Sequence, residues 1–255
     1  MSCDKHHRIA LVDGDIYIFQ AAVVAETPTD WGNGLWTLHA DQREAEVMLH
    51  QKLYELQATV DADEVIVALS SRENFRKDIL PTYKGNRKDV RKPMLIPALR
   101  QYVQEQFQTY ERPGLEGDDI LGILATWDGL RGTKIIVTGD KDMYTIPGYV
   151  YMSHKHEFGI AKVSEEDARY QHMLQTLTGD TTDGYSGCPG VGPVKARKVL
   201  DAVEGEPKDY WGAVVKAYEK AGLSEEEALV QARVAYILQA SHYDFHNKEP
   251  ILWTP

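Results

Sequence analysis

The sequence predicts an α/β fold with a central, mostly parallel twisted sheet flanked by helices. Three apolar runs, at residues 9–13, 65–69 and 134–138, have the composition of buried strands. The stretches between them carry helical periodicity, and strands that alternate with helices indicate parallel βαβ units. A chain of 255 residues with 43% hydrophobic residues can bury the core of such a sheet, as one large domain or two small ones.

The first and third apolar runs end on acids. The first leads into Asp13, with Asp15 two residues later, and the third leads into Asp140 and Asp142. Because ligands in open α/β sheets bind at the carboxyl ends of strands, we expect these acids to meet at one edge. A single strand-end Asp can equally be a turn residue, and Asp15 receives less weight than Asp13. The second run ends on Ser70-Ser71 instead.

A third source of acid is the stretch 115–125, which places Glu116, Asp118 and Asp119 directly before an apolar run with helical spacing. The pattern predicts the first turn of a buried helix. Acids at this position suit the positive end of the helix dipole, which is the simpler interpretation. Three crowded carboxylates also repel one another unless a cation lies among them, so a divalent metal site is the sharper hypothesis.

The other predicted elements serve the core. An Asn33-Gly34 turn between β-forming residues predicts a small hairpin over 31–38. Asp41 and Ser224 have the spacing of helix caps, and a third cap at Ser164 begins a helix that runs to about residue 177. Residues 93–107 also read as an amphipathic helix.

The basic residues are concentrated in one segment. Residues 72–100 hold nine Lys or Arg and three acids, in a chain of net charge −11. A solvated charged loop would explain such a run, but Phe75 and Tyr83 lie among the bases. This mixture is typical of segments that contact a phosphate backbone and stack on unpaired bases.

A Gly-Val-Gly turn at Gly190 and Gly192 precedes a further predicted helix. Such a turn leaves backbone N–H groups free to bind phosphate, and Lys195, Arg197 and Lys198 follow in the first turns. An ordinary Gly/Pro loop is the alternative. The pattern favours a helix-hairpin-helix contact with the DNA backbone.

Composition bounds the class of protein. Two cysteines far apart in sequence indicate neither a disulfide framework nor a zinc site, and they fit a reducing cytoplasm. No apolar segment is long enough to span a membrane, and we expect no membrane partner. The net charge argues against a general nucleic-acid binder unless acids and bases are segregated, as they are in this sequence.

Taken together, the motifs resemble the 5′-nuclease superfamily, which includes flap endonucleases and the 5′-nuclease domain of DNA polymerase I. Within it they are most similar to the 5′→3′ exonucleases of podovirus-type phages. The matching segments are Leu11-Val12-Asp13-Gly14-Asp15, Asn74-Phe75-Arg76-Lys77, Tyr83-Lys84-Gly85-Asn86-Arg87, Leu115-Glu116-Gly117-Asp118-Asp119, Gly139-Asp140-Lys141-Asp142, the run from Gly179 to Gly187, and Ile251-Leu252-Trp253.

The resemblance implies a PIN-like nuclease core over 1–160 with a helical arch at about 72–110. A helix–three-turn–helix DNA-binding region over 161–255 would pack on the core. Two Mg²⁺ or Mn²⁺ ions would be bound, one by Asp13, Glu116, Asp118 and Asp119. The other ion would be bound by Asp140, Asp142, Asp180 and Asp183, with Asp140 or Asp119 near both.

The resemblance also implies the activity. The protein would be a metal-dependent 5′→3′ exonuclease or flap nuclease with a two-metal mechanism, acting in phage DNA replication, recombination or RNA-primer removal in the host cytoplasm. Lys84 and Arg87 would face the scissile phosphate, and replacing Asp119 by alanine would stop cleavage without unfolding the protein. We expect a monomer that binds duplex DNA at a 5′ end, flap or nick, with RNA–DNA hybrids as further candidates and K⁺ as a candidate ligand of the Gly190–Gly192 turn. The expected DNA contacts are Arg76, Tyr83, Lys84, Arg87, Lys88, Arg91, Gly190, Gly192, Lys195, Arg197 and Lys198.

One position departs from the family pattern. Members commonly carry an Asp where Ser71 stands, so the first cluster would have one charge less. A catalytically decayed DNA-binding protein is therefore one alternative. The other is a haloacid-dehalogenase-like phosphatase, whose Asp-x-Asp motif Asp13-Gly14-Asp15 imitates and which would make Asp15 essential.

Overall fold

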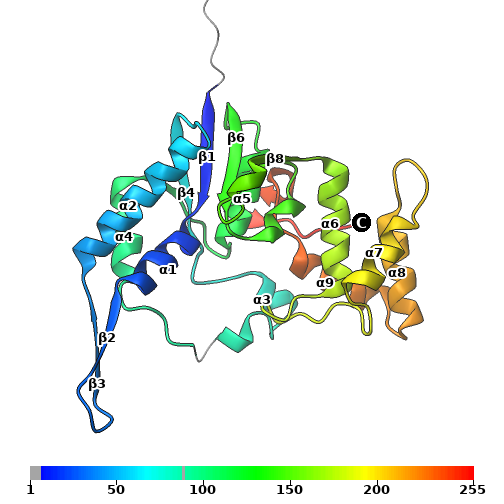
Figure 1. Cartoon of the computed structure of the whole chain (residues 1–255). Coiled ribbons are helices and arrows are strands. Elements are labelled where there is room, and N and C mark those ends of the chain that lie inside the picture. Colours follow the sequence, from blue (N-terminus) through cyan, green and yellow to red (C-terminus); the bar gives the residue numbers. More distant parts are fainter. Residues whose placement is uncertain (1–6, 88–89) are drawn as a thin grey trace, which may run out of the picture.

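A six-stranded sheet forms the centre of the computed structural model, which describes residues 7–87 and 90–255 (Figure 1). The strand order is β5-β4-β1-β6-β7-β8, and every neighbouring pair is parallel except β7 and β8. The strands are β1 (Arg8–Asp13), β4 (Glu64–Ala68), β5 (Gln108–Tyr110), β6 (Thr133–Thr138), β7 (Gly148–Met152) and β8 (Ile160–Val163).

The register of the sheet sets the position of the acids. β1 lies between β4 and β6, with Asp13 opposite Ala68 and Val12 opposite Val137. The carboxyl ends of these three strands therefore meet at one edge, as predicted. The predicted mostly parallel α/β fold is confirmed, and three further strands, β5, β7 and β8, extend the sheet on both sides.

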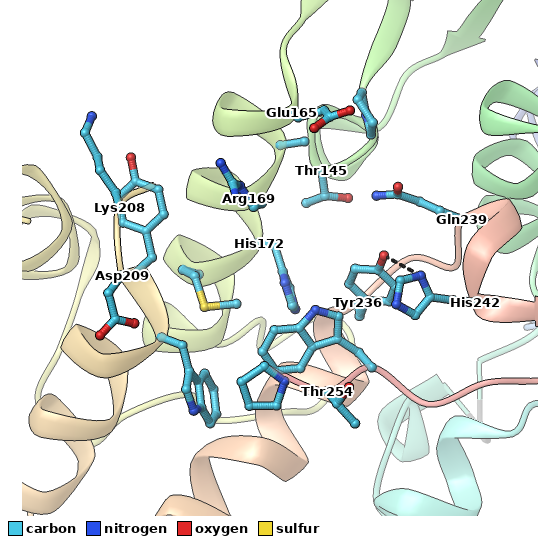
Figure 2. A pocket seen from close by; sticks show the side chains of 17 residues that line it. Thr145, Glu165, Arg169, His172, Lys208, Asp209, Tyr236, Gln239, His242 and Thr254 are labelled. Atoms are coloured by element: carbon cyan, nitrogen blue, oxygen red, sulfur yellow. Dashed lines mark hydrogen bonds between the residues drawn. The ribbon is translucent and has the colours of Figure 1, made fainter. Parts of the chain in front are cut away.

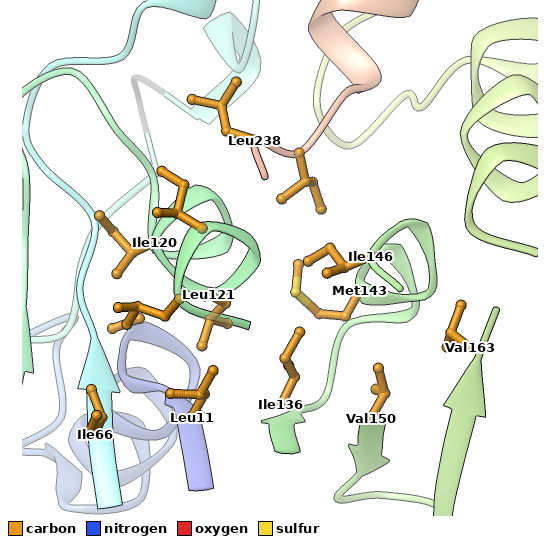
Figure 3. Close-up of a cluster of buried hydrophobic side chains, with 14 of the residues drawn as sticks. Leu11, Ile66, Ile120, Leu121, Ile136, Met143, Ile146, Val150, Val163 and Leu238 are labelled. Atoms are coloured by element: carbon orange, nitrogen blue, oxygen red, sulfur yellow. The ribbon is translucent and has the colours of Figure 1, made fainter. Parts of the chain in front are cut away.

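Helices cover both faces of the sheet. On one face α1 (Gly14–Val24), α2 (Gln42–Thr59) and α4 (Ile96–Gln106) bury apolar side chains against β1, β4 and β6. On the other face α5 (Gly117–Thr126) packs Ile120 and Leu121 near Leu11, Ile136 and Ile66 (Figure 3). Leu238, from the segment after the last helix, closes this second core.

The last third of the chain is helical. The helices α6 (Glu165–Thr178), α7 (Pro193–Asp201), α8 (Tyr210–Lys220) and α9 (Glu225–Ala235) share a core of their own. Ser164 and Ser224 cap α6 and α9 as predicted, because each side chain accepts a hydrogen bond from the third residue of its helix. The predicted domain limits of 1–160 and 161–255 remain a prediction.

The predicted hairpin is present. β2 (Glu26–Asp30) and β3 (Trp36–Ala40) pair in antiparallel fashion, and both residues of the Asn33-Gly34 turn have positive φ, which the Asn-Gly dipeptide tolerates. The hairpin projects from the body of the molecule (Figure 1). A second small ribbon, β9 (Tyr243–Asp244) with β10 (Glu249–Pro250), lies near the end of the chain.

The segment expected to form a helical arch, at about 72–110, is helical in part, and its role as an arch remains a prediction. Between β4 and α4, the structure forms the one-turn α3 (Arg76–Ile79), a 3₁₀ turn at Gly85–Arg87 and otherwise irregular chain. The reason is that this segment is anchored: Arg76 and Tyr83 are buried in the body. Lys88 lies outside the described residues, so its predicted DNA contact has no structural counterpart. Further 3₁₀ turns occupy Lys141–Thr145, His156–Phe158 and Ala240–His242.

None of the helices within the described residues is both long and apolar enough to cross a lipid bilayer.

Candidate active site

The first group of acids forms where β1, β6 and α5 meet. Asp13 ends β1 and caps α1 by accepting a hydrogen bond from the Ile16 amide. The Thr138 hydroxyl, at the end of β6, donates to Asp13 Oδ2 over 3.1 Å and accepts from the Asp140 amide over 3.0 Å. A single hydroxyl therefore fixes the spacing of two strand-end acids.

Asp118, in the first turn of α5, belongs to the same group. Burial and the charges of Asp13 and Glu116 raise the pKa of Asp118 well above its ordinary value. Burial, with the charges of Asp15 and Asp140, raises the pKa of Asp13 to about 7. Both shifts have the same physical cause, which is negative charge crowded into a poorly solvated place without enough compensating cations.

The second group lies beside it. Asp140 Oδ1 accepts from the Asp142 amide over 2.9 Å, and Asp142 in turn accepts from Gln175 of α6 over 2.7 Å. Burial and the charge of Asp140 raise the pKa of Asp142 to about 7. Asp180, in the loop after α6, accepts from the amides of Thr182 and Asp183, and its charge also raises the pKa of Asp142.

Two residues of the segment after α3, Tyr83 and Lys84, connect the two groups, and Arg87 contacts the second. The Tyr83 hydroxyl lies 2.8 Å from Glu116 Oε2 and 3.1 Å from Asp183 Oδ2. Lys84 Nζ pairs with the same two carboxylates, at 2.5 and 3.5 Å, and Arg87 pairs with Asp183 at 2.6 Å. Burial raises the pKa of Glu116, but Arg76 and Lys84 outweigh it and hold that pKa at about 2. Glu116 is therefore a permanent anion next to two cations.

Asp119 is neutralised by the protein itself, which corrects its predicted role as a shared metal ligand and catalytic acid. Its side chain is fully buried, and its two oxygens each lie 2.7 Å from a terminal nitrogen of the Arg76 guanidinium. Asp119 also accepts from the amides of Glu116 and Leu238. Four donors from the protein satisfy this carboxylate, so it has no need of a metal.

The predicted DNA contacts of Arg76 and Tyr83 are also wrong. Arg76 is 2% exposed and donates to the carbonyls of Val234 and Tyr236 as well as to Asp119. Tyr83 is 3% exposed and has its hydroxyl engaged by the acids. Both residues hold the base of the basic segment on the body instead of facing solvent. Arg91 is exposed, and its guanidinium pairs with Glu26 of β2.

Asp15 has a larger role at the end of β4 than its weaker sequence signal indicated. Its carboxylate accepts from the Ser70 amide over 2.7 Å and pairs with Arg100 over 3.0 Å, and its charge acts on Asp13. Ser70 Oγ accepts from the Gly117 amide over 2.8 Å, whereas Ser71 Oγ accepts from the amide of its neighbour Glu73 over 3.3 Å. The end of β4 thus has an acid close by, supplied from α1. The signal available in the sequence was the alternation of Asp13 and Asp15.

The chemistry of the two groups fits divalent cations. Across the ranges 7–87 and 90–255, no three His, Cys, Asp or Glu side chains are already close enough together to enclose an ion. The fit is electrostatic: Asp13 is buried, Asp118 and Asp142 are partly exposed, and the charges that raise the pKa of each come from other acids. Oxygen-rich, negatively charged sites of this kind suit Mg²⁺ and Mn²⁺.

Comparison with known proteins identifies the family. Residues 8–170 match the family model described as 5′-3′ exonuclease, N-terminal resolvase-like domain. The chain is 31% identical to the exonuclease of Escherichia phage T7 and 32% identical to the exodeoxyribonuclease of Enterobacteria phage T3. Each alignment covers 97% of this chain and 93% of the relative. The chain belongs to the 5′–3′ exonuclease family.

Solved structures show the same fold as this exonuclease. The T5 D15 protein co-crystallised with metal ions has a TM-score of 0.64 at 17% identity, over 90% of this chain and 89% of the other. The bacteriophage T5 D15 flap endonuclease in complex with DNA and metal ions has the same TM-score at 16% identity, with the same coverage. The family assignment excludes the phosphatase alternative and makes the protein a nuclease.

The Gly190–Gly192 turn of this exonuclease lies where α7 begins. Gly192 is the N-cap of α7, Gly190 has a φ of +72°, and both are exposed. Lys195, Arg197 and Lys198 are exposed on the helix, and Lys195 Nζ donates to the Gly190 carbonyl over 2.8 Å. The predicted turn and helix are confirmed, while their DNA contact and the helix–three-turn–helix remain predictions.

A cavity of about 480 Å³ lies apart from the acids, between α6 and the end of the chain (Figure 2). Aromatic rings of Trp211, Tyr236 and Trp253 line it, and none of the acids of the two groups does. His172 also lines it and donates a hydrogen bond from Nε2 to the Ala232 carbonyl over 2.8 Å, and burial lowers the pKa of His172 to about 4. This histidine is thus a neutral core residue, and Trp253 packs on the core as expected.

Proposed function

We propose that this nuclease hydrolyses DNA phosphodiesters from 5′ ends, using divalent metal ions bound at the carboxyl edge of β1 and β6. The observation that carries the proposal is the convergence there of acids from β1, α5, the turn after β6 and the loop after α6. The relatives from phages T7 and T3 are named exonucleases, and the T5 structures are described with metal ions and with DNA. These descriptions support the same chemistry in this chain.

The two acid groups would hold two ions. Asp13, Glu116 and Asp118 would bind one, and Asp140, Asp142, Asp180 and Asp183 the other. A pair of Mg²⁺ or Mn²⁺ ions supplies Lewis-acid activation of water and stabilises charge on the leaving oxygen. Thr138, Gln175 and Tyr83 position the carboxylates through the hydrogen bonds described above.

Lys84 and Arg87 would stabilise the negative charge that develops on the scissile phosphate. Both side chains already contact the acids. Lys84 pairs with Glu116 and Asp183, and Arg87 pairs with Asp183. We expect Lys84→Ala to slow cleavage far more than it weakens DNA binding, in single-turnover cleavage and anisotropy titrations. Equal losses in both would make Lys84 only a backbone contact.

Exposed cations on both sides of the acids would bind the duplex. Arg87 and Arg91 lie on the basic segment, and Lys195, Arg197 and Lys198 lie on α7 beside the N–H groups of its first turn. K⁺ at the Gly190–Gly192 turn remains a candidate. Because Lys195 already occupies the Gly190 carbonyl, K⁺ would have to compete with that ammonium group.

The test is cleavage of a blunt duplex and a 5′-flapped duplex, each labelled at the 3′ end, with Mg²⁺, Mn²⁺ or EDTA. We expect metal-dependent laddering from the blunt 5′ end; a single cut at the flap junction would instead indicate an endonuclease. A hybrid with RNA at the 5′ end tests primer removal, and sedimentation tests the expected monomer. DNA binding without cleavage in either metal would contradict the proposal and favour a decayed site at Ser71. We place the activity in phage DNA replication or recombination in the host cytoplasm.

A further inference from the structure

The cavity between α6 and the end of the chain has the size and lining of a small-molecule site, and the chemistry proposed at the acids does not use it (Figure 2). Its volume of about 480 Å³ falls within the range of roughly 300–1,000 Å³ that is typical of ligand pockets. Its aromatic lining includes Trp211 and Trp253, whose ring centroids lie 5.2 Å apart. Such sites combine aromatic walls with a few polar groups that orient the ligand.

His172 supplies a hydrogen-bond acceptor that the fold leaves without a donor. The residue is 3% exposed, and its Nε2 lies 2.8 Å from the Ala232 carbonyl. Because a carbonyl can only accept, Nε2 carries the proton and Nδ1 keeps its lone pair. No donor to Nδ1 occurs within residues 7–87 and 90–255. Polar groups of buried side chains normally have partners, so this ring indicates a ligand that brings an N–H or O–H group into the cavity.

Hydrogen-bond donors at the cavity are also unused. Neither the Trp253 indole N–H nor the Gln239 side-chain amide has a hydrogen-bond partner in the part of the chain that the structure describes. The Trp211 indole N–H, in contrast, donates to Glu225 over 3.0 Å. The ligand that matches this lining is a flat ring whose edge carries both N–H donors and lone pairs. Nucleobases have this property, and they stack on aromatic side chains.

One cation at the cavity is available for an anionic group. Arg169 lies three residues before His172 on α6, and both line the cavity, so they share one side of the helix. Arg169 is exposed and forms no ion pair with any described residue. Lys208 also lines the cavity, but it pairs with Glu166 at 2.6 Å. A phosphate joined to a base at His172 would therefore meet the Arg169 guanidinium, a group well suited to phosphate.

Two acids limit the charge of the ligand. Glu165 and Asp209 also line the cavity. Glu165 is exposed, and Asp209 caps α8 by accepting from the Gly212 amide over 2.8 Å. One available arginine beside two carboxylates suits a ligand with a single phosphate better than a ligand with three.

We propose that this cavity binds a free nucleoside 5′-monophosphate, with the base held by the Trp253 indole and His172 and the phosphate held by Arg169. Nucleoside monophosphates are the class of product that stepwise cleavage from a 5′ end releases. The inference rests on the proposed function for this source of the ligand, while binding itself is measured without cleavage. The protein would then bind its own product at a second site, apart from the acids.

Tryptophan fluorescence tests the site in the absence of metal. Deoxyadenosine 5′-monophosphate (dAMP) is titrated in EDTA, where the acid groups repel its phosphate, into wild-type protein and Trp211→Phe/Trp253→Phe. We expect saturable quenching in the wild type and loss of most of it in the double variant. Calorimetry should still detect binding to the double variant, because phenylalanine keeps an aromatic wall. Quenching that persists in the double variant would place the nucleotide elsewhere and overturn the proposal.

The phosphate contact is tested at an exposed residue, where replacement leaves the fold intact. Arg169→Ala should bind dAMP about tenfold more weakly, since a charged hydrogen bond is lost, and Arg169→Lys should recover part of the loss. The exposed Arg131→Ala is the matched control and should bind dAMP as the wild type does. Deoxyadenosine, which has no phosphate, should bind equally to the wild type and Arg169→Ala. An equal loss for both ligands, or deoxyadenosine triphosphate binding more tightly than dAMP, would contradict the assignment.

Bound DNA distinguishes a free nucleotide from a base of the DNA strand. We expect dAMP to bind in EDTA with unchanged affinity when the protein is saturated with a 5′-flapped duplex. Competition between the two would mean that the cavity holds a base of the strand, and the free nucleotide would be wrong. Normal cleavage without dAMP binding at millimolar concentrations would overturn the cavity site and leave the nuclease in place. Binding of dAMP by protein that does not cut DNA with Mg²⁺ or Mn²⁺ would instead overturn the proposed function.

Discussion

Two adjacent acids at the start of α5, Asp118 and Asp119, have opposite surroundings. Asp119 is buried against the Arg76 guanidinium and two backbone amides, so the protein itself satisfies its charge. Asp118 is partly buried beside the charges of Asp13, Glu116 and Asp140, which raise its pKa, while Lys84 lowers it. A buried carboxylate that the fold already neutralises is structural, while one that the fold leaves short of cations is available for a metal.

The largest expected effect is a loss of unfolding free energy on replacing Asp119. Asp119→Ala leaves the Arg76 guanidinium buried without its partner, and breaking a buried pair in this way costs about 3–5 kcal/mol of unfolding free energy. Urea denaturation of the variant measures this loss. The exposed Asp128→Ala is the control and should stay within about 0.5 kcal/mol of wild type. A normal stability for Asp119→Ala would contradict a structural role.

Asp118 should show the opposite pattern, in which stability is kept and cleavage is lost. Asp118→Asn removes a repelled charge, so we expect unchanged or higher stability in EDTA. Cleavage with Mg²⁺ should fall at least roughly a hundredfold, the order of one lost charge contact in an active site. Single-turnover cleavage and thermal unfolding on the same preparation measure both. Near-normal cleavage would remove Asp118 from the metal ligands.

Replacing Asp13 should have a smaller effect on stability, and that effect should depend on pH. Its pKa in the folded protein is raised to about 7 from 3.8, so the stability it contributes is complete below about pH 4 and is lost as the pH rises through about 7. Asp13→Asn stays neutral throughout. In EDTA its melting temperature should match wild type below about pH 4 and exceed it by a growing margin up to about pH 7, with the full difference near about pH 8.

Comparing the two proteins at each pH cancels other groups, such as His172, whose lowered pKa has the opposite effect below its ordinary value of 6.5. Mg²⁺ should stabilise wild type near about pH 8 and reduce the difference. A gap in melting temperature that does not change with pH would contradict the crowding of charge at Asp13.

We expect the smallest change in stability and cleavage on replacing Tyr83. Tyr83→Phe keeps the buried ring and removes the hydroxyl that joins Glu116 to Asp183. Because Arg76 and Lys84 still hold Glu116, we expect a loss of about 1 kcal/mol in unfolding free energy. Cleavage should slow more at low Mg²⁺ than at high Mg²⁺, which a merely structural role would not produce.

Local sequence patterns predicted the parts of the molecule that depend on local chemistry. The three buried strands and their terminal acids could be read from apolar runs, because parallel strands bring their carboxyl ends together. The Asn33-Gly34 hairpin and the Ser164 and Ser224 caps follow from turn and cap preferences. The order of the motifs along the chain indicated the family.

The errors come from contacts between distant residues. Nothing near Asp119 in the sequence indicates that Arg76, 43 residues earlier, neutralises it. The same pairing buries Arg76, which composition alone places in a DNA-binding segment. β5 has only three residues (Gln-Thr-Tyr), and β7 (Gly-Tyr-Val-Tyr-Met) has a single Val, so neither has the Ile/Val/Leu-rich run that identified the other strands.

The most direct test compares Asp118→Asn with Asp119→Asn, measuring cleavage per folded molecule at a temperature where both are folded. Asparagine keeps an acceptor oxygen for the Leu238 amide and avoids the cavity that alanine leaves at position 119. We expect Asp119→Asn to be less stable but active, and Asp118→Asn to be stable but inactive. A folded Asp119→Asn as inactive as Asp118→Asn would contradict the division between a neutralised and an available acid.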